Sequence, residues 1–329
     1  MGAGRLFRSG EQFVVRDVPA QTADRARAFL RAGAVGFKPA TPRLSSSVLL
    51  MRERRGREKT VWSIERDPAL ATVRERAVAL RAAGAPLPYP LAVPDNGVEV
   101  FMIRRQRSMP TSPNAVVFPG GGADVRDVEE DLPWEGPAPS EWAMLLGVSE
   151  ETARRAVVAA VREVYEETGV LLAGTPNGTV VDDLSGAAWS EHRAALSGHR
   201  ESFAGFLRAR GLRLRSDLLG AKARWTTPSY EPRRYDTFFF AAAVPVGQEP
   251  DGECSESFIS DWVQPCWAFV RGDDGTINLL PPTKYNLEQA MCAASLEGAL
   301  RSVAAPVQRM MLEPFVREDG SIALRTLVP

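Results

Sequence analysis

The chain has 329 residues, enough for about two average domains, and 44% of them are hydrophobic, as in an ordinary globular protein. Its 40 basic residues are balanced by 41 acidic ones and no aromatic-basic RNA motif occurs, which argues against nucleic acid as the main partner. No apolar run reaches membrane length and the three cysteines form no close pair, so we expect a cytoplasmic protein without a membrane partner.

Runs of apolar residues predict the first elements of the fold. A short strand is expected from Gln12 to Val15, and a helix follows it and ends near Leu30. The next strand is expected from Ser46 to Met51. After a polar stretch, helical periodicity predicts a helix from Asp67 to Ala82, and alternation predicts a strand from Val98 to Arg105.

A second helix is predicted to start after Ser149 and to carry a stripe of glutamates. Ser149 is a good N-cap, and Gly169 suits the left-handed position just past a helix end. At roughly 100° of turn per residue, Glu163, Glu166 and Glu167 emerge within about a third of the circumference. Such a stripe is either solvated surface or a site for a hard divalent cation, and oxygen ligands favour Mg²⁺ or Mn²⁺.

The remaining chain alternates between strand and helix patterns. Residues 170–172 predict a buried strand, and 187–211 a helical region in which Phe203, Phe206 and Leu207 have core spacing. The segment from Phe238 to Val244 is apolar on both faces, as a central strand covered by helices would be. A final hairpin is expected to turn at Asp319 and Gly320.

The nine residues from Arg162 to Val170 resemble the core of the Nudix box, Arg-Glu-hydrophobic-any-Glu-Glu-any-Gly-hydrophobic, at every fixed position. The resemblance implies an α/β protein, a Nudix-type α/β/α sandwich with a mixed β-sheet. It also implies hydrolysis of a nucleoside diphosphate linked to another group, with Glu163, Glu166 and Glu167 as ligands of Mg²⁺ or Mn²⁺. Glu167 is the best candidate for the catalytic base, and Arg162 can hold Glu166 one turn away.

The first half of the box is displaced in this chain. The uninterrupted box has a glutamate eight residues before the arginine, and that position is Arg154 here. A glycine run at 120–122 resembles the expected start, and Gly121 would offer a carbonyl to the metal. The segment between them is acidic and rich in proline, a composition typical of a solvated loop that binds no metal. An interrupted box resembles the branch of mammalian peroxisomal coenzyme A diphosphatases.

This resemblance implies an N-terminal extension, 1–43, to which the sequence assigns no role, and a Nudix hydrolase domain, 44–329, with insertions at about 56–94 and 123–148. Further blocks are similar to the same branch, among them 224–228 and 233–240. Glu256 is preferred to Glu253 as a second catalytic or metal-binding glutamate because of its register with Trp262. The candidates for gripping substrate phosphates are Arg104, Arg105, Arg233 and Arg234.

Several functional readings follow from the resemblance. Coenzyme A or an acyl derivative is the leading substrate, while NADH, ADP-ribose or another dinucleotide is the alternative within the same chemistry. A nucleotide-sensing module without catalysis is the alternative of another class, supported by the missing box glutamate. His192 and His199 lie apart from any cysteine, so we expect them to be surface or structural residues. Oligomeric state does not follow from the sequence.

Overall fold

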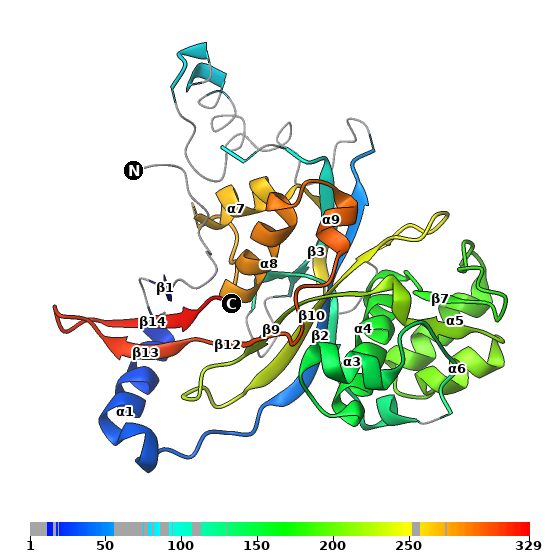
Figure 1. Cartoon of the computed structure of the whole chain (residues 1–329), viewed down its shortest axis with the longest axis horizontal. Coiled ribbons are helices and arrows are strands. Elements are labelled where there is room, and N and C mark those ends of the chain that lie inside the picture. Colours follow the sequence, from blue (N-terminus) through cyan, green and yellow to red (C-terminus); the bar gives the residue numbers. More distant parts are fainter. Residues whose placement is uncertain are drawn as a thin grey trace.

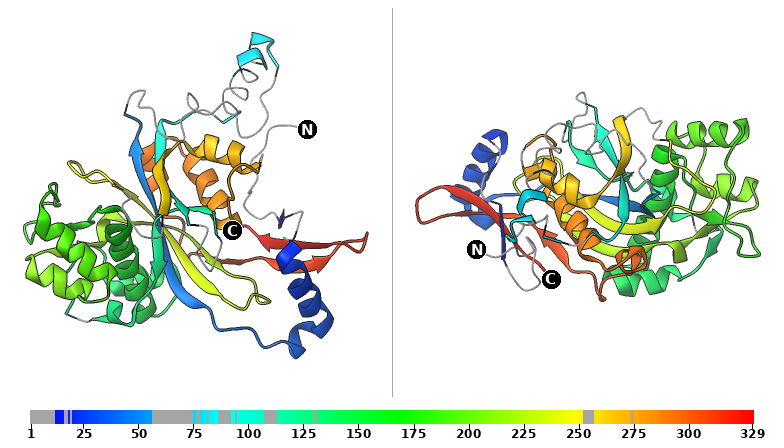
Figure 2. Two further views of the ribbon diagram at one scale, coloured as in Figure 1. Left: turned by 180° about the vertical axis from the view of Figure 1, so that it is seen from behind. Right: turned by 90° about the horizontal axis from the view of Figure 1, so that it is seen from above.

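A computed structural model describes residues 12–15, 18, 20–55, 75, 78–80, 82–85, 92–93, 95–106, 113–129, 131–251, 257–273 and 275–329. In it a mixed β-sheet separates two groups of helices (Figure 1). The view from behind shows the same two groups on opposite sides of the sheet (Figure 2). The predicted helix from Asp67 to Ala82 lies largely outside the described residues. None of the described helices is both long and apolar enough to cross a bilayer.

The central sheet has eight strands within the described residues, in the order β11-β3-β2-β10-β9-β12, with β4 beside β3 and β5 beside β2. β10 is parallel to β2 and antiparallel to β9, so the sheet is mixed. The predicted strands are confirmed, although β2 and β10 each begin three residues early. The bounds are β2 Arg43–Glu53, β3 Val98–Arg105, β4 Val116–Val117, β5 Gly120–Gly122, β9 Gly220–Thr226, β10 Tyr235–Ala243, β11 Ser257–Val263 and β12 Arg309–Met311.

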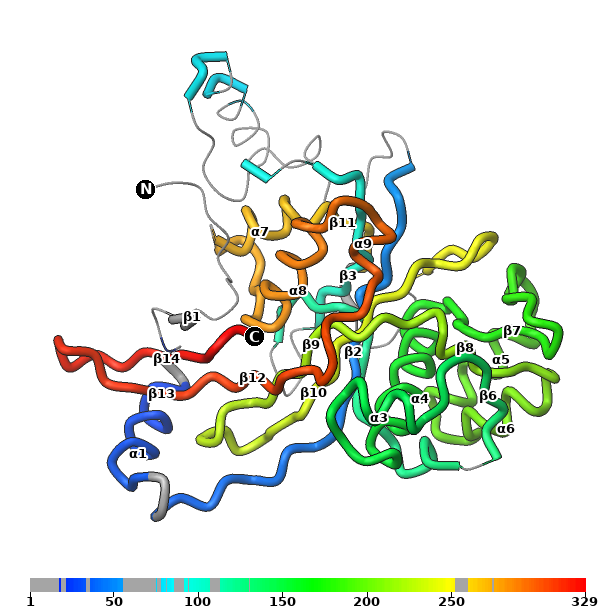
Figure 3. The backbone as a smooth tube through the Cα atoms, viewed as in Figure 1, coloured from blue at the N-terminus to red at the C-terminus, as the bar shows by residue number. Residues whose placement is uncertain are grey.

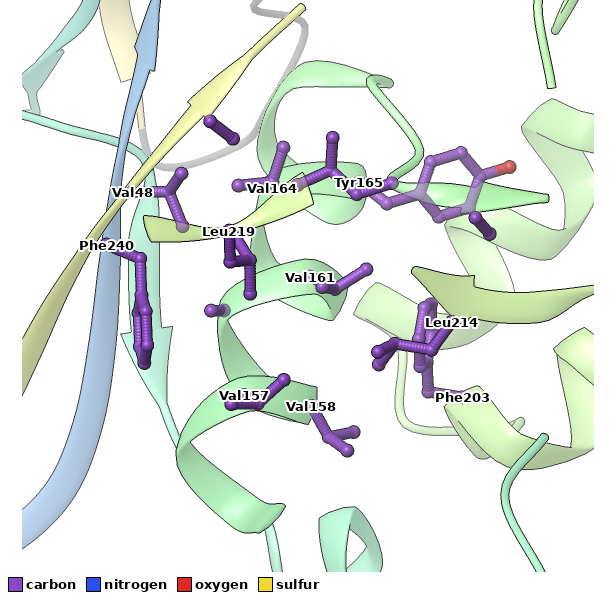
Figure 4. Packing of buried hydrophobic residues seen from close by; sticks show 14 of the residues in the cluster. Val48, Val157, Val158, Val161, Val164, Tyr165, Phe203, Leu214, Leu219 and Phe240 are labelled. Carbon is purple, nitrogen blue, oxygen red and sulfur yellow. The ribbon is translucent and has the colours of Figure 1, made fainter. Parts of the chain in front are cut away.

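The sheet is buried on both faces, which explains why β10 is continuously apolar. Phe238 and Phe240 point to the core on the side of helix α4 (Glu150–Thr168). Phe239 points to the opposite core, which contains α7 (Pro265–Asp273), α8 (Pro281–Cys292) and α9 (Leu296–Leu300). Figure 4 shows the valines of α4 between the sheet residues and a further layer that contributes Leu214 and Phe203. Helix α4 is therefore held from two sides.

The further layer consists of a small sheet and two helices. The sheet has the order β6-β8-β7, with β6 Trp134–Glu135, β7 Ala173–Gly174 and β8 Arg213–Arg215, which precedes a 3₁₀ turn, η2 Ser216–Leu218. The helices are α5 (Ala187–Ser197) and α6 (Phe203–Ala209). The predicted core positions in α6 are confirmed, since Phe203, Phe206 and Leu207 are all buried. The Phe206 ring stacks on the Tyr165 ring with centroids 5.3 Å apart.

The expectation of a solvated loop at 123–148 is wrong. This segment contains a 3₁₀ turn, η1 (Val125–Val128), strand β6 and helix α3 (Pro139–Leu146). Trp142 and Leu146 of α3 are buried, and the Trp142 ring meets Phe240 of the central sheet edge-on at 5.7 Å. Their (i, i+4) spacing puts both side chains on the face of α3 that meets the sheet, a short apolar run inside a segment that is otherwise acidic and rich in proline.

The predicted strand at 170–172 is also corrected. These residues are fully buried, but ladder pairing begins only at β7. The side chain of Gln248 takes the place of a neighbouring strand: its Oε1 accepts from Leu171 N at 2.8 Å, and its Nε2 donates to Leu171 O at 3.0 Å. The segment is extended and satisfied by an amide side chain, which no local pattern predicts.

The two ends of the chain fold together. Strand β1 (Gln12–Val15), predicted at these bounds, pairs antiparallel with β14 (Ile322–Leu327), which also pairs with β13 (Glu313–Val316). The predicted hairpin turn is confirmed, with Gly320 at a φ of 79°. Helix α1 (Ala20–Gly36) runs past its predicted end and changes direction at Gly33. Figure 3 shows α1 beside β13, away from α4.

Candidate functional site

Helix α4 is formed and ended as its sequence predicts. Ser149 Oγ accepts from Thr152 N at 3.3 Å, and Gly169 takes the left-handed conformation with a φ of 73°. The last two turns carry the box glutamates around Arg162, which is buried. Its Nη1 donates to Glu163 Oε1 at 2.8 Å and to Glu166 Oε1 at 3.0 Å. The predicted contact between Arg162 and Glu166 is therefore present, and the same guanidinium gathers Glu163.

Asp127 is the acidic partner that sequence reasoning missed. Its carboxylate accepts from Arg162 Nε and Nη2, both at 3.1 Å, and its side chain is only 2% exposed. It comes from the segment expected to be a loop without a role, whereas Arg154, at the ungapped box position, lies beside the Trp134 ring. Asp127 thus gives Arg162 a buried carboxylate partner from outside the helix.

A local signal for Asp127 was present in the sequence. Asp124 and Asp127 form a reciprocal capping box, in which Asp124 Oδ1 accepts from Arg126 N at 2.9 Å and Asp127 Oδ2 accepts from Asp124 N at 2.7 Å. An acid at the N-cap with another acid three residues later predicts a helical turn. That turn directs Asp127 to α4, because the strand before it is already fixed on β2.

The glycine run forms β5 and meets the glutamates directly. Its pairing with Ser45, Ser46 and Ser47 of β2 brings it beside α4, where Gly120 N donates to Glu167 Oε2 at 2.7 Å. A Cβ on Gly121 would lie 2.5 to 2.6 Å from the carboxylate atoms of Glu163. Only a glycine leaves room for this carboxylate. The predicted partners Gly121, Glu163, Glu166 and Glu167 are thus brought together.

The cluster is short of positive charge. Arg162 contacts three carboxyl groups, so one guanidinium is shared by three acids. Burial raises the pKa of Glu163 to about 7, since lost solvation outweighs the nearby Arg162, and Glu166 adds to the rise. Burial would lower the pKa of Arg162, but Glu163 and Asp127 outweigh it and raise that pKa. An added cation would balance the charge.

The donor set fits a hard divalent cation by its chemistry. The available ligands are carboxylates and the backbone oxygens of β5, which suit Mg²⁺ or Mn²⁺ better than softer metals. Within the described part of the chain, no three acidic, imidazole or thiol side chains converge on one point as metal ligands do. The carboxylates of Glu163 and Glu166 turn toward Arg162 instead. The oxygen ligands and the excess of acids therefore fit a divalent cation, while Glu163 and Glu166 point to the Arg162 guanidinium in this structure.

Gly121→Ala is expected to weaken Mn²⁺ binding about 10-fold while leaving the protein folded. The new methyl group meets only the end of a flexible side chain, so Glu163 moves and the backbone stays. Gly120→Ala is the contrasting variant, because its Cβ would collide with the backbone of Ser46 and Ser47 and its φ is 154°. It should lose about 1–3 kcal/mol of stability. Calorimetric Mn²⁺ titration and thermal unfolding would measure both, and unchanged Mn²⁺ affinity in Gly121→Ala would contradict the assignment.

The other predicted site residues lie in different places. Arg104 and Arg105 are on β3 beside β4, the strand that leads into the glycine run. Arg233 is exposed in the turn between β9 and β10. Arg234 is buried there and donates to Thr227 O at 3.0 Å and Ala40 O at 2.8 Å, so it ties this turn to the N-terminal segment. We therefore correct its assignment from substrate binding to structure. Glu253 and Glu256 lie outside the described residues.

The histidines and Asp236 have structural surroundings. His192 Nδ1 lies 2.8 Å from Glu201 and its ring packs on Phe206, while His199 Nδ1 lies 2.6 Å from Arg126 Nη2. Asp236 accepts from Arg224 Nε at 3.1 Å and Nη2 at 2.7 Å, an ion pair between the adjacent strands β9 and β10. The blocks at 224–228 and 233–240, which resemble the coenzyme A diphosphatase branch, thus form the two strands of one hairpin, joined by this ion pair.

Comparison with known proteins supports the fold. No family model matches the chain, and no curated protein matches it. Among solved structures, the chain is similar to the crystal structure of a NUDIX hydrolase from Alicyclobacillus acidocaldarius, with a TM-score of 0.57 and 23% sequence identity. The alignment covers 80% of this chain and 99% of that chain. At this identity the likeness establishes the Nudix fold, and the activity has to be inferred from the site.

Proposed function

We propose that the protein is a Nudix hydrolase that uses divalent metal to cleave the phosphoanhydride of a nucleoside diphosphate linked to another group. The observation that carries this proposal is the Arg162 cluster at the end of α4, facing the glycine strand β5. Three carboxyl groups share one guanidinium there, and a Cβ on Gly121 would occupy the space of the Glu163 carboxylate. Arg162, Glu163, Glu166 and Glu167 lie on α4, and the glycines lie on β5 beside it.

Each residue then has a distinct task. Glu163, Glu166 and Glu167 would hold Mg²⁺ or Mn²⁺, with the Gly121 carbonyl beside them. A bound divalent cation would neutralise the diphosphate and favour ionisation of the attacking water. Glu167 is the proposed base, and its hydrogen bond from Gly120 N keeps its carboxylate at the glycine strand. Arg162 touches no substrate in this proposal: Asp127 fixes it, and it orients Glu163 and Glu166.

The substrate is proposed by resemblance. Coenzyme A or an acyl derivative would give 3',5'-ADP and a 4'-phosphopantetheine, while NADH, ADP-ribose or another dinucleotide would use the same machinery. Arg104, Arg105 and Arg233 are proposed to bind the substrate phosphates, and Arg234 is left out because its donors serve the fold. A sensing module without catalysis is the rival, but the displaced box acid that supported it has a substitute in Asp127.

Hydrolysis is expected to require Mg²⁺ or Mn²⁺ and to stop when a chelator removes them, since the proposed ligands are all oxygen. The test is a panel of coenzyme A, acyl-coenzyme A, NADH and ADP-ribose, with products assigned by mass spectrometry. Restored activity on returning the metal is the control for damage by the chelator. Full turnover in metal-free buffer would remove the metal from the proposal, and no turnover with bound Mn²⁺ would favour a sensing module.

A further inference from the structure

The last turn of α4, which carries Glu166 and Glu167, is closed by residues from two other parts of the chain. A helix leaves its final carbonyls without helical partners. Here the Tyr165 carbonyl accepts from Gly169 N at 2.9 Å, as in many helices that end in glycine. The Glu166 carbonyl accepts from Arg193 Nε at 2.9 Å, and the Thr168 carbonyl accepts from Asp251 N at 3.0 Å. Helix α5 and the segment after β10 therefore complete this turn.

Arg193 and Asp251 also bind each other. Arg193 Nη1 donates to Asp251 Oδ2 at 2.6 Å, and Nη2 donates to Oδ1 at 3.0 Å, the bidentate geometry in which arginine is strongest. The Arg193 side chain is only 15% exposed, and its positive charge lies at the helix end where the macrodipole favours it. All three guanidinium nitrogens of Arg193 therefore donate to groups at the end of α4 or to Asp251. Figure 1 shows α5, the helix that carries Arg193, beside α4.

Gly169 is shaped to admit this pair. A Cβ at Gly169 would lie 3.1 Å from Arg193 Nη1 and 3.2 Å from Asp251 Oδ2, closer than ordinary side-chain packing. The chain after Gly169 is also fixed. The side chain of Gln248, three residues before Asp251, hydrogen-bonds to both the N–H and the carbonyl of Leu171. The segment after β10 is therefore attached to Thr168 at the end of α4 and to Leu171 just beyond it, and Arg193 joins that segment to Glu166.

We infer that Arg193 is a positioning residue for the proposed metal site, and that its pair with Asp251 sets the direction in which Glu166 and Glu167 leave the helix. The inference rests on the proposed function. Both glutamates lie in the turn whose carbonyls Arg193 and Asp251 hold, so a change in this corner rotates the two ligands together. Arg162 and Gly120 fix the carboxylate ends, whereas Arg193 fixes the backbone from which they extend.

The test is calorimetric titration of the full chain with Mn²⁺ alone, which needs no substrate. Arg193→Ala should bind Mn²⁺ about 10-fold more weakly, the loss expected for residues that orient metal ligands. Arg193→Lys should recover little of the lost affinity, because lysine keeps the positive charge but cannot make the bidentate hydrogen bonds of a guanidinium. A role of the charge alone at the helix end would instead be restored by lysine. Asp251→Asn should show a smaller loss, since the backbone N–H at 251 is kept.

Arg215→Ala is the matched control. Arg215 also makes a bidentate pair, with Asp217 at 2.8 and 2.6 Å, is 14% exposed and lies outside α4. Its replacement should lower the melting temperature by a similar amount without changing Mn²⁺ affinity. Equal affinity in Arg193→Ala and the wild type would overturn the inference and leave the proposed function standing. A wild type that neither binds Mn²⁺ nor hydrolyses the panel would overturn both. If Arg193→Ala does not fold, an unchanged affinity in Asp251→Asn overturns the inference.

Discussion

Arg162→Met is expected to lower the free energy of unfolding by about 3–5 kcal/mol, the cost of removing one partner from a buried ion pair. Methionine fills much of the same volume, so the effect comes from charge. Asp127, Glu163 and Glu166 have side chains that are 2%, 14% and 12% exposed, and they would be left without their shared guanidinium. Chemical denaturation would measure the loss, and a loss below about 1 kcal/mol would mean that the cluster does not depend on Arg162.

The loss in Arg162→Met should depend on pH in a defined direction. Burial already raises the pKa of Glu163 above its ordinary value, and the loss of Arg162 would remove the positive charge that opposes this rise. A group whose pKa is higher in the folded than in the unfolded chain contributes stability that is fully present below its unfolded pKa. This stability is lost as pH rises through its folded pKa. The variant should therefore be closer to the wild type at pH 5 than at pH 8. Arg208→Met is the control, because its pair with Asp131 is exposed and should be worth at most about 1 kcal/mol at either pH.

Glu166→Gln and Glu167→Gln are each expected to lower kcat by at least about 10²-fold, the contribution of a positioned acid-base group. Stability should change little. Glutamine at 167 can still accept from Gly120 N, and glutamine at 166 leaves Arg162 with Asp127 and Glu163. Steady-state kinetics with thermal unfolding would separate the two effects.

Glu151→Gln is the matched control for these two variants, since Glu151 lies in the first turn of the same helix and is exposed. It should keep normal kcat. Near-normal kcat in Glu166→Gln or Glu167→Gln would show that the replaced carboxylate is an ordinary surface group. It would exclude that residue as a metal ligand or catalytic base.

The segment 123–148 changes what a deletion is expected to do. From composition alone, a short Gly-Ser linker in place of the part between Asp124 and Trp142 is expected to keep metal binding, because a polar loop has little apolar surface to lose. The structure contradicts the assumption behind this expectation, since the replacement removes the Asp127 partner of Arg162 and the first turn of α3, the helix that carries the buried Trp142. The interruption of the box is therefore an integral part of the candidate site.

The sequence by itself determined the features whose causes are local. The (i, i+3) and (i, i+4) spacing put Glu163, Glu166 and Glu167 on one helix face, Ser149 and Gly169 set the ends of that helix, and apolar runs located β2, β3 and β10. Only neighbouring residues enter these relations, so they can be predicted without knowing the fold.

The tertiary structure decided which distant groups meet. Asp127 reaches Arg162 across 35 residues, Gln248 replaces a strand beside Leu171 across 77, and Arg193 meets Asp251 across 58. None of these pairs has a period or a spacing that marks it, because its partners come together only after the sheet and its helices have packed. The same packing turned Arg234 from a candidate for substrate binding into a tether for Ala40 and Thr227. Side-chain pairing across the fold, and not local propensity, completes the site.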